Sequence, residues 1–241
     1  MRGLLRAAGA VAVLLLAGCA EVPDPSGAND PYESFNRQVF DFNHKLDKAV
    51  IKPVAEAYVD VVPAPARDGV HNVLVNLNLP ITFANDLLQG DLERGSETFW
   101  RFAINSSLGL GGLFDVATTN FHIPFHTEDF GQTLAVWGVQ EGPYLVLPVV
   151  GPDPPRDIGG QIGDTVMDPW TYWPHIRDKF WWSVGRGVLS GIDLRARNLD
   201  TLDQIERQSI DLYASIRSLY RQNRNNEIRN GKPDVSDLPN L

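Results

Sequence analysis

The sequence predicts an all-α protein made of short helices joined by loops, with few or no strands. Apolar residues recur every three or four positions in several segments, as on one face of a helix. Outside residues 144–150, no run of five residues alternates convincingly between apolar and polar side chains. The 21 glycines and 17 prolines exceed the average share of about 12%, which predicts short and often interrupted elements.

The N-terminus has the features of an export signal. Arg2 and Arg6 precede ten apolar residues, 7–16, and small residues end the run. Crossing the hydrocarbon core needs roughly 20 apolar residues, so a membrane span is disfavoured. We predict that residues 1–18 are a signal peptide.

The only cysteine follows directly, and Leu16-Ala17-Gly18-Cys19 resembles a bacterial lipobox. After cleavage Cys19 would be the first residue and would carry about three acyl chains. One myristoyl chain binds marginally, so three make attachment effectively permanent. Ala20, in place of an aspartate, indicates sorting to the outer membrane. An ordinary signal peptide with a chance cysteine is the alternative.

Net charge excludes several partners. Loss of Arg2 and Arg6 takes it from −9 to −11, which disfavours nucleic acid and electrostatic docking on anionic lipid. Contact with a membrane must therefore be apolar or covalent. With Cys19 acylated, no thiol remains for a disulfide, a metal or nucleophilic catalysis.

The first predicted helix follows a polar tether at 19–29 that contains two prolines. Asp30 can cap this helix, Pro31 suits its first turn, and Glu33 can complete a capping box. Its apolar face comprises Tyr32, Phe35, Val39, Phe42 and Leu46.

Prolines divide the next region, which predicts separate short helices near 53–61, 65–76 and 81–88. An apolar helix is expected through 99–113, inside the stretch WRFAINSSLGLGGLFDVAT. Glycines in that stretch permit close approach between helices in a membrane.

Five predictions concern the second half of the chain. A helix should begin near Thr127-Glu128-Asp129. The apolar run 144–150 contains Pro148, so we expect an extended, rigid, exposed loop, with a short edge strand as the alternative. Helices are predicted at 157–168 and, as one long helix, from Thr201 through Leu219. Residues 222–241 should form a loose tail.

Catalytic motifs are lacking: there is no nucleophile elbow, phosphate loop or His-Glu-x-x-His. His122 and His126 are four apart, but Pro124 disfavours the helix that a metal pair would need. Ser106 and Ser107 have no histidine or acid at a familiar spacing, which favours hydrogen bonding to a helix backbone.

Several segments are apolar enough that one interior could not bury them all. Half a bilayer would solvate the surplus. Helices of about 10–16 residues are too short to cross the whole hydrocarbon core, so we predict a protein seated in one leaflet. Tryptophans clustered at 170–182 would mark the headgroup level. A soluble core rich in aromatic residues is the alternative.

Five blocks, in order, resemble the MlaA (VacJ) family of outer-membrane lipoproteins. The similarity covers about residues 30–220 and includes the lipobox. The blocks are DPYESFNRQVFDFNHKLDKAV, NLNLPITFANDLLQGD, RFAINSSLGLGGLFDVA, EDFGQTLAVWGVQEGPYLVLPVVGP and DIGGQIGDTVMDPW.

The resemblance implies a domain at 30–221 shaped as a ring, or doughnut, of short helices in the inner, periplasmic leaflet of the outer membrane, around a central amphipathic channel. Family members remove mislocalised phospholipids from the outer leaflet and pass them to a periplasmic carrier protein, often while bound to a trimeric porin. No cofactor and no enzymatic step are implied. There are two alternatives: a passive scaffold that tethers a porin, and an acyl hydrolase.

The resemblance also suggests roles for individual residues. Phe42 and Asn43 would line or gate the channel. The remaining channel or rim candidates are Leu108, Gly109, Gly111, Gly112, Tyr144, Leu145, Val146, Leu147 and Pro148. Trp170, Trp173, Trp181 and Trp182 would be the interfacial aromatics. The tail and the 122–126 loop depart from the family pattern, which bears on porin docking and on the rim.

Overall fold

The computed structural model describes residues 29–173 and 178–232. The predicted signal peptide, Cys19 and all of the tether except Asn29 lie outside these residues. The elements are α2 (Glu33–Leu46), the π-helix η2 (Asp47–Ile51), α3 (Lys52–Val61), α4 (Ala64–Leu88), α5 (Leu92–Ser107), α6 (Val116–Phe121), α7 (Phe130–Val136), β1 (Val146–Leu147), β2 (Gly151–Pro152), α8 (Pro155–Met167), the 3₁₀ turn η3 (Pro169–Thr171), α9 (Lys179–Arg197), α10 (Leu199–Gln208) and α11 (Leu212–Ile228).

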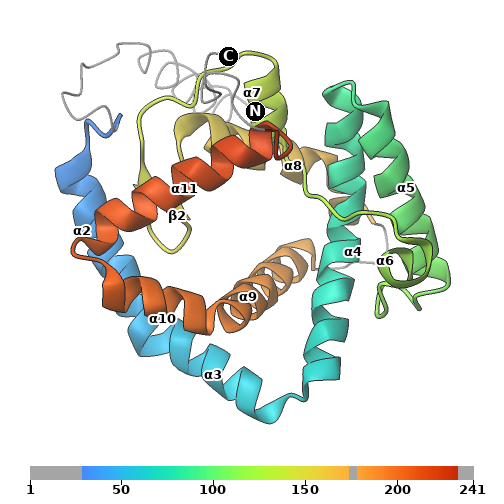
Figure 1. Ribbon diagram of the computed structural model, residues 1–241, viewed down its shortest axis with the longest axis horizontal. Helices are drawn as coiled ribbons and strands as arrows, with labels where there is room; N and C mark the ends of the chain where they lie inside the picture. The colour runs from blue at the N-terminus through green and yellow to red at the C-terminus, as the bar shows by residue number, and fades with distance from the viewer. Residues whose placement is uncertain (1–28, 174–177, 233–241) are drawn as a thin grey trace, which may run out of the picture.

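These helices are arranged as a ring (Figure 1). In this view α2, α3 and α4 follow one another around the left, lower and right sides, while α11, α8 and α7 close the upper side. Helix α9 lies inside the ring. Strands β1 and β2 form a two-residue antiparallel hairpin. The prediction of an all-α ring with few strands is confirmed.

Helix α4 corrects the prediction of separate helices at 65–76 and 81–88. It runs unbroken through Pro80, although proline removes a backbone hydrogen bond. Buried contacts outweigh that cost: Leu79 and Ile81 are buried, and Asn76 donates to Ser106 Oγ at 3.0 Å. Tertiary packing against α5 therefore overrides the local break.

The start of α2 differs from the predicted cap. Asp30 does not cap this helix; Tyr32 occupies the N-cap position and makes no side-chain cap bond. The Asp30 carboxylate instead accepts hydrogen bonds from the Tyr213 hydroxyl, Arg217 and Asn36. It thus joins the first helix to α11.

The C-terminal helices also differ from prediction. The expected single helix from Thr201 breaks at Ser209 into α10 and α11. Asp211 explains the break, because it caps α11 through Ala214 N at 3.1 Å and pairs with Arg37 at 2.7 Å. The hydrogen bond from Arg37 lowers the Asp211 pKa to about 2.

Helix α9 was not predicted as a helix at all.

The predicted loose tail is wrong for its first seven residues. Helix α11 continues to Ile228, past the predicted boundary at 222. Arg224 holds it in place: it is buried and lies 2.6 Å from Asp129 and 2.9 Å from Asp157. Ion pairs with residues far away in sequence give Arg224 a structural role. The part of the tail from 233 onward lies outside the described residues.

Burial in the ring is inverted relative to a water-soluble domain. Within the described residues, nineteen polar or charged residues are buried against seven apolar ones. Large apolar side chains such as Trp100, Leu110 and Phe180 are exposed instead. A patch of this extent normally marks a surface that contacts lipid or protein. In residues 29–173 and 178–232, no helix combines the length and apolar character needed to cross a membrane.

Helices α7, α8 and α11 meet around a buried set of ion pairs. Gly131 and Gly160 let α7 and α8 touch, since a Cβ on Gly160 would lie 2.4 Å from Gly131 N. Burial alone would raise the Asp129 and Asp157 pKa values, but hydrogen bonds from Arg224 outweigh it and hold both below their usual range. This stabilisation is present at neutral pH and is lost as pH falls below about 4.

Asp164, beside this set, behaves in the opposite way. Burial raises its pKa to about 6, although its Oδ1 accepts bonds from Asn85 Nδ2 and Phe130 N, both at 3.0 Å. A carboxyl whose folded pKa is raised favours the protonated folded state. Its ionisation therefore costs stability as pH rises from about 4 through 6.

We expect Asp164→Asn to raise stability at pH 7.5 and to leave it unchanged near pH 4, because the amide oxygen can accept both bonds without ionising. Thermal unfolding in detergent across pH 4–8 measures this. Asp41→Asn, at an exposed position on α2, is the control and should not alter the pH profile. Parallel pH profiles for wild type and Asp164→Asn would contradict the prediction.

Candidate functional site

Two asparagine side chains of α2 form hydrogen bonds with the edge of the hairpin, where a neighbouring strand would otherwise pair. Asn36 and Asn43 are seven residues apart, which puts them on one face of the helix two turns apart. Asn36 Nδ2 donates to Tyr144 O at 2.9 Å, and its Oδ1 accepts from Val146 N at 3.0 Å. Asn43 repeats the pattern, donating to Leu147 O at 2.8 Å and accepting from Val149 N at 2.7 Å.

The base of the hairpin is buried, which corrects the expected exposed loop. Tyr144 and Val146 are buried and pack with Tyr213 of α11. The Tyr144 and Tyr213 rings meet edge to face at 6.3 Å. Burial, with Asp30 nearby, raises the pKa of the Tyr144 hydroxyl. The alternative prediction, a short edge strand, describes 146–147 better.

Only the tip of the hairpin is exposed. Val149 and Val150 are 66% and 60% exposed, and Pro148 is also exposed. Val149 has φ +71°, a conformation that a β-branched residue rarely adopts. Strain of this kind costs of order 1–3 kcal/mol and persists only where the surroundings enforce it. The hydrogen bond from Val149 N to Asn43 is part of that enforcement.

Phe42 and Asn43, predicted together as channel residues, have different surroundings. Asn43 contacts the hairpin, whereas the Phe42 side chain is 53% exposed. The structure thus brings Asn43 together with one of the rim candidates, Leu147, and with Val149 at the hairpin tip. The role of Phe42 stays a prediction.

The glycine-rich segment forms a turn after α5 rather than a continuous helix. Helix α5 ends at Ser107, and positive φ values follow at Leu110, Gly111 and Gly112. A Cβ on Gly112 would lie 2.5 Å from Asn76 Cβ, which explains glycine there as a close contact with α4. No described residue lies within 4 Å of a Cβ placed on Gly111, so its positive φ, rather than a close contact, explains the glycine there.

This turn presents apolar side chains outward. Leu108, Leu110 and Phe114 are exposed, while Gly109 packs against the backbone of Asn105 and Phe114. The sequence analysis expected Leu108 and Leu110 in an apolar helix, and the structure places them in a turn instead. The channel or rim role of Leu108 and Gly109 stays a prediction. The residues that hold the turn were missed.

An ion pair between Arg101 and Asp115 holds the turn in place. The buried Arg101 guanidinium binds both carboxylate oxygens of Asp115 at 2.9 and 3.0 Å and donates to Ile123 O at 2.6 Å. Asn105 donates to the same carboxylate at 2.9 Å. The signal for this ion pair in the sequence was an arginine within the apolar stretch 99–104, because a buried charge requires a partner.

The predicted interfacial tryptophans lie in or just after η3 and on α9. Trp170 donates to Leu77 O at 2.8 Å and lies beside Trp173, with ring centroids 5.9 Å apart. Trp181 and Trp182 lie on α9 and are exposed. The structure brings Trp170 and Trp173 together, whereas Trp181 packs edge to face on Phe180 with ring centroids 5.2 Å apart. The depth of these rings in a membrane stays a prediction.

The polar candidates have structural partners. His126 Nε2 lies 3.2 Å from the Asp86 carboxylate and 3.0 Å from Thr98 Oγ1, and His122 ends α6 in the left-handed region. Ser107 Oγ donates to Ala103 O at 2.6 Å, which confirms the predicted bond to the helix backbone.

We expect Val149→Gly to stabilise the protein by about 1 kcal/mol, because relief of strain exceeds the entropy cost of glycine. Val150→Gly is the matched control, equally exposed but without positive φ, and should destabilise by about 0.5–1 kcal/mol. Unfolding of both variants in detergent measures the difference. Equal losses in both would mean that the tip is unstrained.

Comparison with known proteins agrees with this architecture. The model of the MlaA lipoprotein family matches residues 28–227. Two relatives named intermembrane phospholipid transport system lipoprotein MlaA, from Shigella flexneri and Escherichia coli K12, are each 42% identical over 92% of this chain and 87% of their own. The relative of that name from Haemophilus influenzae is 32% identical over 92% of this chain and 89% of its own.

A solved structure is also similar. This structure, described as "Structural basis for maintenance of bacterial outer membrane lipid asymmetry", aligns with a TM-score of 0.74 at 40% identity, covering 83% of this chain and 98% of that one. Together with the family match over nearly the whole described chain, this similarity shows that the protein belongs to the MlaA lipoprotein family.

Proposed function

We propose that this protein is an outer-membrane lipoprotein that takes mislocalised phospholipids from the outer leaflet and passes them through the ring to a periplasmic carrier, maintaining lipid asymmetry. Membership of the MlaA family, whose relatives carry the name of a phospholipid transport system, supports this most directly. Cys19 would anchor the chain to the inner leaflet. A trimeric porin would be its partner in the membrane.

The inverted burial supports a seat within one leaflet. Exposed apolar side chains on α5, α9 and the turn at 108–114 would contact acyl chains. Figure 1 looks down the shortest axis, and α3, α4 and α11 run across the view. A ring lying flat in the leaflet can therefore contain α4, whose 25 residues at 1.5 Å each exceed the length of a single-leaflet span.

A conduit of this kind needs no covalent chemistry. Moving two acyl chains of ordinary length into water would cost roughly 20 kcal/mol, at about 0.8 kcal/mol per methylene. A path with apolar and polar sides removes most of that barrier, because the chains stay in apolar surroundings while the headgroup follows polar groups. The hairpin would form part of its rim, positioned by Asn43.

The test compares cells that lack this protein with cells complemented by wild type. Surface phospholipid, measured by reaction with a membrane-impermeant label, should fall to normal on complementation. Failure of wild type to lower it would refute the transport role. Native mass spectrometry of detergent-extracted complexes should detect bound phospholipid and porin together.

We expect Asn43→Ala to complement less well than wild type and to leave several-fold more labelled lipid at the surface. The change removes both bonds that hold the tip, each worth about 1 kcal/mol. Asn223→Ala is the control, since Asn223 is exposed on α11 and bonds only Glu227 among the described residues. Full complementation by Asn43→Ala would remove the hairpin from the mechanism without affecting the transport role.

A further inference from the structure

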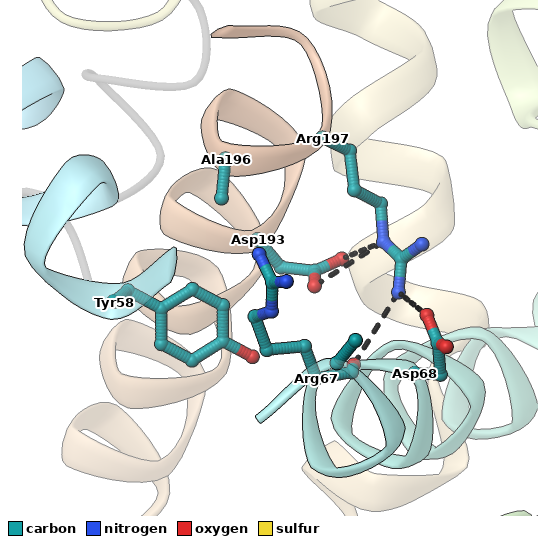
Figure 2. A pocket seen from close by; sticks show the side chains of 7 residues that line it. Tyr58, Arg67, Asp68, Asp193, Ala196 and Arg197 are labelled. Carbon is teal, nitrogen blue, oxygen red and sulfur yellow. Dashed lines mark hydrogen bonds and ion pairs between the residues drawn. The ribbon is translucent and has the colours of Figure 1, made fainter. Parts of the chain in front are cut away.

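A cavity lies where α3, α4 and α9 meet, away from the hairpin. Its volume is about 280 Å³, near the lower end of small-molecule pockets. It is lined by Tyr58, Ala64, Arg67, Asp68, Asp193, Ala196 and Arg197. Figure 2 shows the charged side chains converging from α4 and α9, with the Tyr58 ring facing them from α3.

The acceptors in this cavity are already occupied. Asp193 is buried and binds His71 Nδ1 at 2.7 Å and Arg197 Nε at 3.2 Å. Arg197 also donates to Asp68 at 3.1 Å and to Arg67 O at 3.3 Å. Both carboxylates therefore have cationic or hydrogen-bonding partners.

The donors are not all occupied. Within the described residues, the Arg67 guanidinium makes no hydrogen bond or ion pair, and its Nε is closed off from solvent. The Tyr58 hydroxyl is likewise closed off and unpartnered. Burial, with Asp193 nearby, raises the Tyr58 pKa, so the phenol remains a donor at neutral pH. Each group left in this state costs stability unless a ligand satisfies it.

The chemistry of the missing partner follows from this imbalance. It must supply acceptor oxygens to a guanidinium and a phenol, and it needs few donors of its own. Phosphate oxygens meet that description, and arginine binds them in a two-pronged manner. Ala64 lies in the first turn of α4, whose N-terminal end also favours an anion. A pocket of this size accepts a headgroup phosphate but not two acyl chains.

We propose that the cavity bounded by Tyr58, Arg67 and Arg197 is a phosphate subsite, which holds the phosphate group of a phospholipid. This rests on the proposed transport function and adds to it a fixed point for the headgroup. Arg67 is the main ligand and Tyr58 the second donor. Arg197 is a positioning residue, since its own bonds to Asp68 and Asp193 set the shape of the pocket.

The experiment titrates the acylated full-length protein, in nonionic detergent, by calorimetry. Three probes separate the sources of binding: short-chain phosphatidylglycerol below its micelle-forming concentration, the matching diacylglycerol without phosphate, and inorganic phosphate. The variants are Arg67→Gln and Tyr58→Phe. Arg207→Gln is the matched control, because Arg207 is exposed on α10 and makes no hydrogen bond or ion pair among the described residues.

We expect phosphatidylglycerol binding to weaken about tenfold or more in Arg67→Gln and about fivefold in Tyr58→Phe, and to be unchanged in Arg207→Gln. Diacylglycerol binding should be equal in all four proteins. Circular dichroism melts confirm that the variants are folded. Should Arg67→Gln fail to fold, Tyr58→Phe, which removes only a hydroxyl, decides the matter.

Three results would overturn the subsite. Equal phosphatidylglycerol affinity in wild type, Arg67→Gln and Tyr58→Phe removes it, and the transport role then stands if wild type still restores asymmetry in cells. Arg67-dependent binding of inorganic phosphate without lipid binding would make it a site for free phosphate only. Absence of any lipid binding together with failed complementation would refute the proposed function as well.

Discussion

Most of the buried charged residues of this protein pair with one another, because so much of its outer surface is apolar. Arg224, with Asp129 and Asp157, shows the consequence most clearly. Desolvating an ion costs several kcal/mol, and removing one partner of a buried pair costs about 3–5 kcal/mol. Such pairs therefore determine where helices may lie. Helices α7, α8 and α11 meet where one guanidinium can reach two carboxylates, and Arg101 fixes the turn after α5 in the same manner.

The hairpin is held by a different device. Its outer edge pairs with asparagine side chains of α2, so these backbone groups are satisfied without a third strand. Two asparagines two turns apart can each supply one donor and one acceptor to an extended chain. Bonds of this kind are few and individually weak. A segment so attached can be well placed and still be released at modest cost, which would suit the proposed role of the hairpin at the rim of a lipid passage.

A phospholipid presents two problems to a protein that moves it. The acyl chains need apolar contact throughout, which an apolar surface supplies without specificity. The phosphate needs oriented donors, which are scarce in such surroundings. Among the described residues, the cavity bounded by α3, α4 and α9 contains an arginine and a phenol whose donors have no acceptor. Division of these tasks between separate surfaces would let the ring accept lipids of different chain length.

Much of this could be predicted from sequence. The 3,4 spacing of Tyr32, Phe35 and Val39 predicts the first helix, and the resemblance of five blocks predicts the ring. Local signals failed where distant partners decide the outcome. Pro80 lies within one helix because α4 packs on α5, and residues 222–228 are helical because Arg224 reaches carboxylates more than sixty positions away. The glycine stretch was apolar as predicted but became a turn.

The sequence by itself determined the apolar surplus, the helical periodicity and the membership of a family. Tertiary structure alone decided which polar residues are buried together, that Asn36 and Asn43 serve the hairpin, and that Arg67 has no acceptor among the described residues. The physical reason is the distance along the chain over which each effect acts. Periodicity and turn chemistry depend on residues only a few positions apart, so a local stretch of sequence specifies them. The partner of a buried charge or amide is chosen by how the helices pack, and no local pattern specifies that packing.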